Sequence, residues 1–360
     1  MCLCPVALTR ECCGKKYTAF VPCGKCEECI KDKQNEYVIR SIEESLKVGN
    51  AWFITLTYND DTVPVVFTDE GEIDEETGEI IEYRGRLLSL NNKDIVNWKK
   101  RVRRSVEYHE KRKIDFSYLI CGEYGPKTHR PHYHGLLIGL SDADAMKFKK
   151  DWETHHGFTY FSKVSNFDID KVAAYTAKYI TKFRELEDEN VINGKVEKPR
   201  KITSVGFGLP TKERFEAMRK DILGDLWNED LNKVVEHINP LKLEKKIKQI
   251  AKKRKYKRNG REYKLPTYYK RRIFYVKDPL TGKMVQSTLS QMVSKAVQMD
   301  VQSDFSKKLI ELATRDDIPE TYEGRVTASK IVCASEERNR QERAEMLFQT
   351  NISALRKSRF

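Results

Sequence analysis

The chain has 360 residues, of which 39% are hydrophobic and 34% are charged. This length suits one large domain or two smaller ones, and the composition is typical of a globular protein with a heavily charged surface. There is no run of about eighteen apolar residues, and the first residues contain no continuous apolar segment of the kind found in signal peptides. The sequence thus argues against membrane-spanning and secreted classes, and we expect a cytoplasmic protein.

Lys and Arg outnumber Asp and Glu by 67 to 54, which gives a formal net charge of +13. A surplus of this size favours a polyanionic partner, above all nucleic acid. A basic surface that only maintains solubility would also account for it. No basic amphipathic helix with an aromatic face is evident, so the charge does not indicate a membrane partner.

The first 35 residues are rich in cysteine, and we expect them to be irregular. Seven of the nine cysteines lie in the first 29 residues, and in a cytoplasmic chain such a cluster indicates metal binding rather than disulfides. Cys23, Cys26 and Cys29 form a C-x-x-C-x-x-C pattern, which is typical of structural zinc. The candidates for a fourth ligand are Cys2, Cys4, Cys12 and Cys13. An iron–sulfur cluster or reduced, unliganded cysteines are the alternatives.

Residues 35–183 alternate between helical and extended periodicity. Helices are predicted where apolar residues recur at helical spacing, at 35–48, 91–113, 141–155 and 168–183. Strands are predicted where β-branched and aromatic residues lie between turn residues, at 51–58, 116–121, 133–140 and 157–164. The acidic segment 68–86 is predicted to form an exposed hairpin or loop. The turn-rich links between strands favour an α+β fold whose central, mostly antiparallel sheet is flanked by helices.

The chain changes character after residue 184, where polar and charged residues dominate. Residues 211–250 are predicted to be helical, and the last part of the chain also has a helical, charged pattern. We therefore expect three parts: a Cys-rich segment with a helix at 1–50, the α+β domain at 51–210, and a helical, basic region at 211–360.

Between positions 242 and 272 there are fifteen Lys or Arg residues and two Glu residues. Four tyrosines are interleaved with them: Tyr256, Tyr263, Tyr268 and Tyr269. Cations bind phosphates and aromatic rings stack on bases, so we predict a DNA-contacting element here, although a solvated helix face would have a similar composition. The candidate DNA-binding residues are Lys252, Lys253, Arg254, Lys255, Lys257, Arg258, Lys270, Arg271 and Arg272.

Two histidines separated by one residue, His132 and His134, stand at the start of a predicted strand. Alternate residues of a strand point to the same face, so both imidazoles can converge on one metal while Tyr133 points away. Glu123 ends the preceding predicted strand and returns to the histidines if the two strands pair as a hairpin. Two imidazoles and a carboxylate suit Mg²⁺ or Mn²⁺ and leave coordination positions open for a substrate oxygen. A pair of histidines on a solvated strand face is the alternative.

Tyr175 and Tyr179 are four residues apart on a predicted helix, which places both hydroxyls on one face. Lys178 and Lys182 each follow one of these tyrosines by three residues. A tyrosine can attack phosphorus when its proton is removed and the phosphate charge is offset. Aromatic residues at this spacing also occur as ordinary core packing, so the catalytic interpretation depends on the metal site that precedes them.

Together these residues resemble the HUH endonucleases, named for histidine–hydrophobic–histidine, and within them the rolling-circle replication initiators of small single-stranded DNA phages, the Microviridae, most of all the gokushovirus branch. The segment FITLTY at 53–58 is similar to the first motif of the family. CGEYG at 121–125 and RPHYHG at 130–135 resemble its metal-binding motif, and AYTAKYITK at 174–182 resembles its two-tyrosine motif.

The resemblance extends to the cysteine stretch at 23–29 and to segments 200–208 and 265–272, so that it covers roughly residues 2–275. It implies an HUH endonuclease domain at 51–210 in which Glu123, His132 and His134 are the metal ligands. It also implies that Tyr175 and Tyr179 are the nucleophiles.

The resemblance implies a replication initiator that nicks single-stranded origin DNA, forms a 5′-phosphotyrosine link, frees a 3′-OH and later rejoins the strand in the host bacterial cytoplasm. A host helicase and DNA polymerase would be its partners. No G-x-x-x-x-G-K-[ST] pattern is present, so no nucleotide cofactor is expected. The alternatives are an HUH relaxase or transposase, and a non-catalytic zinc-containing nucleic-acid-binding regulator.

Overall fold

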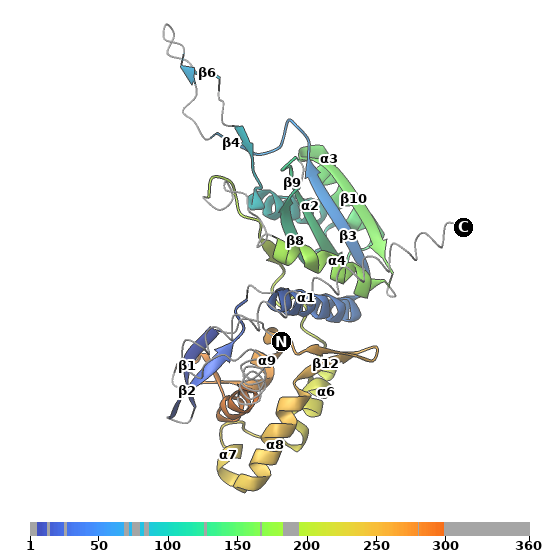
Figure 1. The fold of residues 1–360 in the computed structure, drawn as a ribbon. Coiled ribbons are helices and arrows are strands. Elements are labelled where there is room, and N and C mark those ends of the chain that lie inside the picture. Colours follow the sequence, from blue (N-terminus) through green and yellow to red (C-terminus); the bar gives the residue numbers. More distant parts are fainter. Residues whose placement is uncertain are drawn as a thin grey trace, which may run out of the picture. The chain divides into compact units, whose positions relative to one another are not determined.

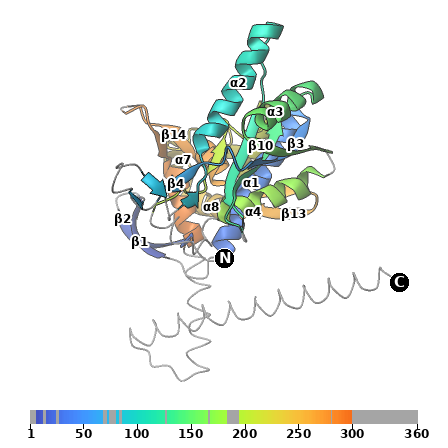
Figure 2. The ribbon, with the colours of Figure 1, turned by 90° about the horizontal axis from the view of Figure 1, so that it is seen from above.

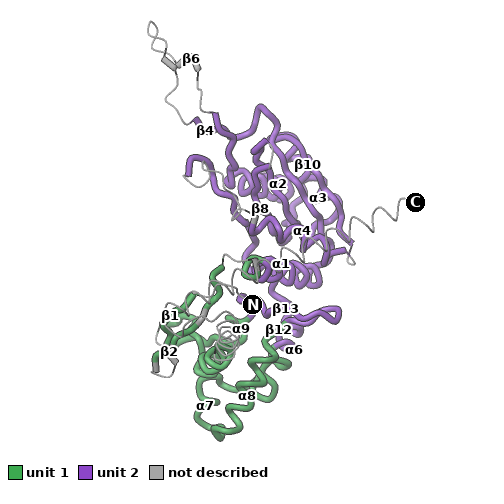
Figure 3. Tube along the Cα trace, in the orientation of Figure 1, with its two compact units in different colours: residues 1–30, 219–255, 270–360 green, residues 31–218, 256–269 purple. Residues whose placement is uncertain are grey.

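In a computed structural model, the chain forms two compact units (Figure 3). Unit 1 comprises residues 1–30, 219–255 and 270–360, and unit 2 comprises residues 31–218 and 256–269. The division at residues 50 and 210 stays a prediction from the sequence. The residues that the structure describes are 6–12, 15–24, 27–67, 72–73, 80–82, 86–125, 128–165, 168–182, 194–279 and 281–298.

A five-stranded sheet forms the centre of unit 2, and all of its strand pairs are antiparallel (Figure 1). The order across the sheet is β10-β3-β9-β8-β11. The bounds of the strands are β3 Ala51–Tyr58, β8 Ser117–Tyr124, β9 Pro131–Ile138, β10 Gly157–Val164 and β11 Lys201–Thr203. The predicted α+β fold with a mostly antiparallel sheet is therefore confirmed.

Four helices flank this sheet, with α2 and α3 on one face and α1 and α4 on the other (Figures 1 and 2). Their bounds are α1 Glu27–Val48, α2 Asn92–Glu110, α3 Asp142–His155 and α4 Ile169–Lys182. The helices α2, α3 and α4 match the predicted ranges closely. The helix α1 begins eight residues before the predicted start, because the polar residues 27–34 continue its turns without an apolar pattern that could announce them.

The two faces of the sheet form separate hydrophobic cores, because successive residues of a strand point to opposite sides. On one side, Ile54 and Leu137 pack with Trp98 of α2 and Trp152 of α3. On the other side, Leu119, Cys121, Leu136 and Ile138 pack with α1 and α4, which contribute Tyr37, Ile42, Ala173 and Ala177 among others. The small residues Ala173 and Ala177 are fully buried, and they allow the backbone of α4 to approach the sheet closely.

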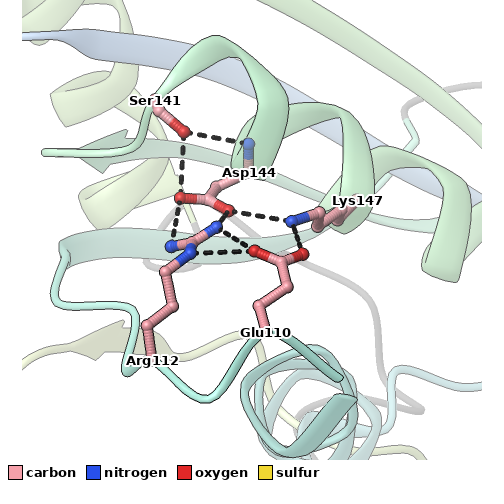
Figure 4. Close-up of polar contacts among 5 residues, drawn as sticks. All are labelled: Glu110, Arg112, Ser141, Asp144 and Lys147. Atoms are coloured by element: carbon pink, nitrogen blue, oxygen red, sulfur yellow. Dashed lines mark hydrogen bonds and ion pairs between the residues drawn. The ribbon is translucent and has the colours of Figure 1, made fainter. Parts of the chain in front are cut away.

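A cluster of charged side chains joins the end of α2 to the start of α3 (Figure 4). Ser141 caps α3 by accepting a hydrogen bond from the Asp144 backbone, and its hydroxyl donates to the Asp144 carboxylate at 2.9 Å. The Arg112 guanidinium donates to both oxygens of that carboxylate, at 3.1 and 2.5 Å. Glu110 and Lys147 complete the cluster.

Short hairpins lie outside the central sheet. Two of them flank the acidic segment, where β4 Val65–Phe67 pairs with β7 Arg86–Leu88 and β5 Glu72–Ile73 pairs with β6 Ile80–Glu82. The predicted hairpin at 68–86 is thus confirmed in its described residues. The first residues were predicted to be irregular, and this is wrong for part of them: β1 Val6–Cys12 and β2 Lys15–Val21 pair antiparallel in unit 1. Their Thr, Val and aromatic residues favour strands, a preference that the cysteines obscured.

The later part of the chain is mostly helical, as predicted for residues 211–250, but it also contains two short hairpins. Its elements are α6 Lys212–Leu223, η1 Gly224–Leu226, α7 Val234–His237, α8 Pro240–Lys253, β12 Lys255–Arg258, β13 Arg261–Lys264, α9 Thr267–Phe274, β14 Tyr275–Lys277 and β15 Met284–Gln286. Residues 288–298 are helical, and the predicted helical end of the chain lies outside the described residues. Within the described ranges, no helix combines the length and apolar character needed for crossing a membrane.

Candidate metal centre and tyrosine pair

The hairpin of β8 and β9 brings Glu123 opposite His132, as the sequence predicted. His134 lies opposite Cys121 on one side and Thr55 on the other. These residues all project from the face of the sheet that α4 covers. The hairpin is closed at Gly125, whose backbone N–H donates to the carbonyl of Arg130 at 3.0 Å.

Glu123, His132 and His134 form a triad whose ligand atoms lie within 4.8 Å of one another. The Nε2 atoms of both histidines are 3.3 Å from Oε2 of Glu123. Glu123 is 6% exposed and His134 is 9% exposed, so the site is largely screened from water on the protein side. The predicted convergence of the three side chains is confirmed.

The other ring nitrogen of each histidine is held by a neighbour. Nδ1 of His132 donates to the backbone carbonyl of Arg130 at 3.0 Å, which leaves the lone pair of its Nε2 pointing at Glu123. Nδ1 of His134 lies 3.0 Å from the hydroxyl of Thr55. Partners of this kind orient metal-binding imidazoles. The donor set and its orientation therefore fit a divalent metal.

Arg130 and Gly135 hold the metal-binding strand in place. The guanidinium of Arg130 donates to the carbonyl of Tyr58 at 2.8 Å and to Asp60 at 2.7 Å, which ties the start of β9 to the end of β3. A Cβ atom at Gly135 would lie 2.7 Å from the carbonyl oxygen of Leu119, so only glycine permits this approach of β8 to β9.

Tyr133, between the two histidines, faces the opposite core, as predicted. It is fully buried, and its hydroxyl accepts a hydrogen bond from the backbone of Asn91 at 3.0 Å. The nearby Tyr58 hydroxyl donates to Asp94 at 2.8 Å. Burial raises the pKa of both phenols far above their ordinary value, so these two tyrosines are structural and stay protonated.

The tyrosine pair on α4 lies directly against the triad. The ring of Tyr179 stacks on the ring of His134, with centroids 4.1 Å apart and planes 18° from parallel. Its hydroxyl donates to the hydroxyl of Tyr175 at 2.6 Å, and Tyr175 is 47% exposed. The prediction that both hydroxyls share one helix face is confirmed.

Burial of the Tyr179 hydroxyl raises its pKa above the ordinary value for tyrosine, and the hydrogen bond with Tyr175 and the charge of Glu123 add to the effect. The site therefore favours the neutral phenol, which is the form that a positive charge in the triad would oppose. Lys178 is exposed on the same helix. Lys182 is the last residue of α4, and its side chain lies outside the described part of the structure.

Phe53 and Thr55 also belong to the site, although the residue-by-residue analysis of the sequence gave them no role. The ring of Phe53 lies 6.1 Å from that of His134 and 5.6 Å from that of Tyr175. The alternation of β3 could have identified both, because its odd positions share the face of the histidines.

The predicted zinc site is only partly within the described residues. The sulfur atoms of Cys23 and Cys29 are 4.0 Å apart, whereas Cys26 lies outside those residues, as do Cys2, Cys4 and Cys13. Cys12 ends β1, and its side chain is not described either. The zinc site stays a prediction.

The basic run is distributed over α8, β12 and α9 rather than along one helix. Lys252, Lys253, Lys255, Lys257, Arg271 and Arg272 are exposed, and Lys270 is half-buried. Arg258 instead pairs with Asp170 at 3.1 Å, and the Arg254 guanidinium lies over the ring of Phe274. In unit 1, Arg271 and Arg272 line an open pocket of about 650 Å³ with Tyr275 and Met284.

Two of the four tyrosines that we expected to stack on bases are buried, so that expectation is wrong for them. Tyr256 is 5% exposed and its hydroxyl donates to the carboxylate of Glu43 at 2.5 Å. Tyr269 is fully buried and its hydroxyl donates to the carbonyl of Gly208. Both side chains fix their segment to the rest of unit 2.

Residues 51–184 match the family model of Replication-associated protein ORF2. This part of the chain contains the triad, the tyrosine pair and four strands of the central sheet. The predicted resemblance to phage replication proteins is thus confirmed at the level of the family.

Three curated phage proteins are similar to the chain, each with 29% identity. The Replication-associated protein VP4 of Bdellovibrio phage phiMH2K matches over 180 residues, which are 46% of this chain and 50% of that protein. The Replication-associated protein ORF2 of Spiroplasma virus 4 matches over 209 residues, 54% and 59% of the two chains. The Replication-associated protein ORF4 of Chlamydia phage 1 matches over 125 residues, 35% and 25%.

The chain therefore spans about half the length of the first two relatives and a quarter of the third. No solved structure matches the chain.

Proposed function

We propose that this protein is a replication initiator that nicks single-stranded phage DNA by tyrosine transesterification, with the HUH arrangement of metal ligands. The observation that carries the proposal is the stacking of Tyr179 on His134, which places a pair of phenol hydroxyls beside the Glu123–His132–His134 triad. The names of the three phage relatives, all replication-associated proteins, support the same role.

Glu123, His132 and His134 would hold a divalent metal, for which we expect Mg²⁺ or Mn²⁺, and the bound metal would polarise the scissile phosphate. The chain's own residues supply the remaining chemistry. The phenol oxygen of Tyr175 or Tyr179 attacks phosphorus after losing its proton, and the 3′ oxygen of the cleaved strand leaves and takes up a proton. The products are a 5′-phosphotyrosine and a free 3′-OH, so the energy of the phosphodiester is kept for rejoining.

The second phenol gives the site a way to reverse the first step on a new strand. While one tyrosine holds the 5′ end, the other can attack a regenerated origin, and the released 3′-OH then displaces the first tyrosine. The two hydroxyls are within hydrogen-bonding distance, so both can reach one phosphate position. Lys178 adds a positive charge on the same helix, and we place Lys182 in this role too.

The exposed cations of the basic run would bind the DNA backbone, which makes the affinity strongly dependent on salt. Zinc at Cys23, Cys26 and Cys29 would stabilise the N-terminal segment. A host helicase and a host DNA polymerase would act on the opened strand and the 3′-OH, and the host cytoplasm would be the site of action.

The decisive experiment is the cleavage of a single-stranded origin oligonucleotide with Mg²⁺ or Mn²⁺, followed by detection of a covalent protein–DNA adduct. Tyr175→Phe together with Tyr179→Phe should abolish the adduct, since neither position then has a nucleophile. An adduct of undiminished yield in this double variant would disprove the mechanism.

His132→Ala tests the metal site in the same assay. We expect cleavage to fall by at least about a hundredfold, the loss typical of a removed electrostatic contact to the reacting group, while DNA binding is retained. His155→Ala is the matched control, because His155 is an exposed histidine at the end of α3, which covers the other face of the sheet. Binding without cleavage in the unmodified protein, at every metal tested, would instead favour a non-catalytic regulator.

A further inference from the structure

The face of the sheet that carries the triad is only partly covered by helices. The helix α4 packs on β8 and β9, whereas β10 lies at the edge of the sheet beside β3. On this edge strand Phe158 is 67% exposed and Tyr160 is 59% exposed. Two large aromatic side chains in water, two residues apart on one strand face, are a surface that binding would bury favourably.

The strand register places these two rings in the same rows as the metal ligands. Phe158 lies opposite Thr57, which lies opposite His132. Tyr160 lies opposite Thr55, which lies opposite His134. Each ring is therefore two strands away from a ligand, which corresponds to about 10 Å.

Ring contacts connect this edge to the tyrosine pair. The ring of Tyr160 lies 6.4 Å from that of Phe53, which lies 5.6 Å from that of Tyr175. Tyr175 in turn meets Tyr179 at 5.2 Å. These rings meet edge to face, at interplanar angles of 62°, 66° and 84°. A continuous aromatic surface therefore runs from the sheet edge to the predicted nucleophiles.

The charges beside this surface favour a nucleic acid strand as its occupant. Lys171 and Lys178 are exposed on α4, four residues before and three residues after Tyr175, so they lie on the helix face that carries the tyrosines. Aromatic rings for bases next to cations for phosphates are the combination by which proteins bind single strands without reading their sequence. A partner that binds through apolar contacts alone would have no use for the cations at this position.

We propose that Phe158 and Tyr160 form a stacking platform for unpaired bases of the DNA strand that enters the site. This inference rests on the proposed function for its substrate class, but it concerns how the strand is held and not how it is cut. Stacking on the platform fixes the strand's path across β10 and β3, and thereby places one phosphate over the triad.

The platform is tested by fluorescence anisotropy with a labelled dT oligonucleotide and no added metal, so that cleavage plays no part. Phe158→Ala and Tyr160→Ala should each weaken binding about tenfold, the loss typical of one stacked base. Phe158→Trp and Tyr160→Phe keep an aromatic ring and should bind as tightly as the unmodified protein. Tyr108→Ala is the matched control, because Tyr108 is 71% exposed on α2, which covers the other face of the sheet.

An abasic oligonucleotide with the same backbone separates stacking from charge. The unmodified protein and both alanine variants should bind it equally, and the emission of Trp in the Phe158→Trp variant should be quenched by the dT strand and not by the abasic one. Equal binding of the dT strand by the Phe158→Ala, Tyr160→Ala double variant would overturn the platform. So would a changed oligomeric state in that variant with unchanged DNA affinity, which would assign the edge to a second copy of the chain.

The two proposals fail in different ways. An adduct in the double phenylalanine variant of the tyrosine pair defeats the nicking mechanism and leaves the affinity differences intact. Normal affinity and normal cleavage in the double alanine variant of Phe158 and Tyr160 defeat the platform and leave the nicking mechanism intact.

Discussion

His134 is the residue at which three elements of the site meet. Its Nδ1 faces Thr55 of β3, its Nε2 faces Glu123 of β8, and its ring carries Tyr179 of α4. A change at this position therefore alters both the metal site and the placement of the nucleophile. Spacing in the sequence indicated the first role, because strand alternation is local, but not the second, which depends on where α4 packs.

Lys99 is a buried cation on α2, 5% exposed, whose ammonium lies 3.5 Å from the centre of the Tyr118 ring. Burial, with the charge of Arg103 adding to it, lowers the pKa of Lys99 from 10.5 to about 8. Since the folded state disfavours the charged form, this cost is complete below pH 8 and disappears as the pH rises from 8 to 10.5.

Lys99→Met should therefore raise the free energy of unfolding at pH 7 by about 1 kcal/mol, after solvent screening and the lost ring contact are allowed for. The gain should shrink between pH 8 and 10.5. Chemical denaturation across this pH range measures it, with the exposed neighbour Lys100→Met as the control. A gain that does not depend on pH would contradict the explanation.

At the scale of elements, the hairpin of β8 and β9 and the helices that follow it divide the work between two ends. Glu123 and His132 lie at the end where the hairpin closes, whereas the cluster of Arg112 and Asp144 lies where β8 begins and β9 has ended (Figure 4). The hydrogen bonds from Arg112 lower the pKa of Asp144 below its ordinary value. This cluster should therefore govern stability and not cleavage.

Asp144→Asn should lower the free energy of unfolding by about 2 kcal/mol, because it removes a charge-assisted pair. Asp144 has a depressed pKa, so its contribution is present above pH 3.8 and is lost as the pH falls through the folded value. Thermal unfolding at pH 7 and at pH 3 measures the difference, and the cleavage rate should not change. Asp142→Asn is the control, since its pair with Lys163 is exposed; an equal loss there would refute the assignment.

Most elements of unit 2 could be predicted from the sequence because their periodicity is strong and local. Residues 51–58 and 157–164 form strands with the predicted bounds, and the triad follows from a hairpin between neighbouring strands. The burial of Tyr256 and Tyr269 could not be predicted, because it depends on contacts with residues about sixty to two hundred positions away in the sequence. The same holds for the stacking of Tyr179 on His134.

At the scale of the whole molecule, unit 2 is completed by residues 256–269, which return to it after an excursion through unit 1. Tyr256 of this segment and Arg214 both bind Glu43, a fully buried carboxylate of α1. Since a buried charge that loses a partner is costly, the returning segment should stabilise the unit that carries the site.

Tyr256→Phe tests this at a single atom. We expect a loss of about 1–3 kcal/mol in the free energy of unfolding, the cost of removing a hydrogen bond to a buried charged group. Tyr263→Phe, in the paired strand β13, is the control because Tyr263 is half-buried. Equal denaturation midpoints for the two variants would show that the segment adds no stability through Glu43.

The separation of the two ends of the sheet also has a practical consequence. The link between α2 and β8 contains Lys113, whose side chain is 86% exposed, and it lies at the end of the sheet away from the triad and the tyrosine pair. A fluorescent dye, a peptide tag or a surface attachment inserted in this link would not obstruct an incoming strand. The protein could thus be immobilised there and observed one molecule at a time while its other end handles DNA.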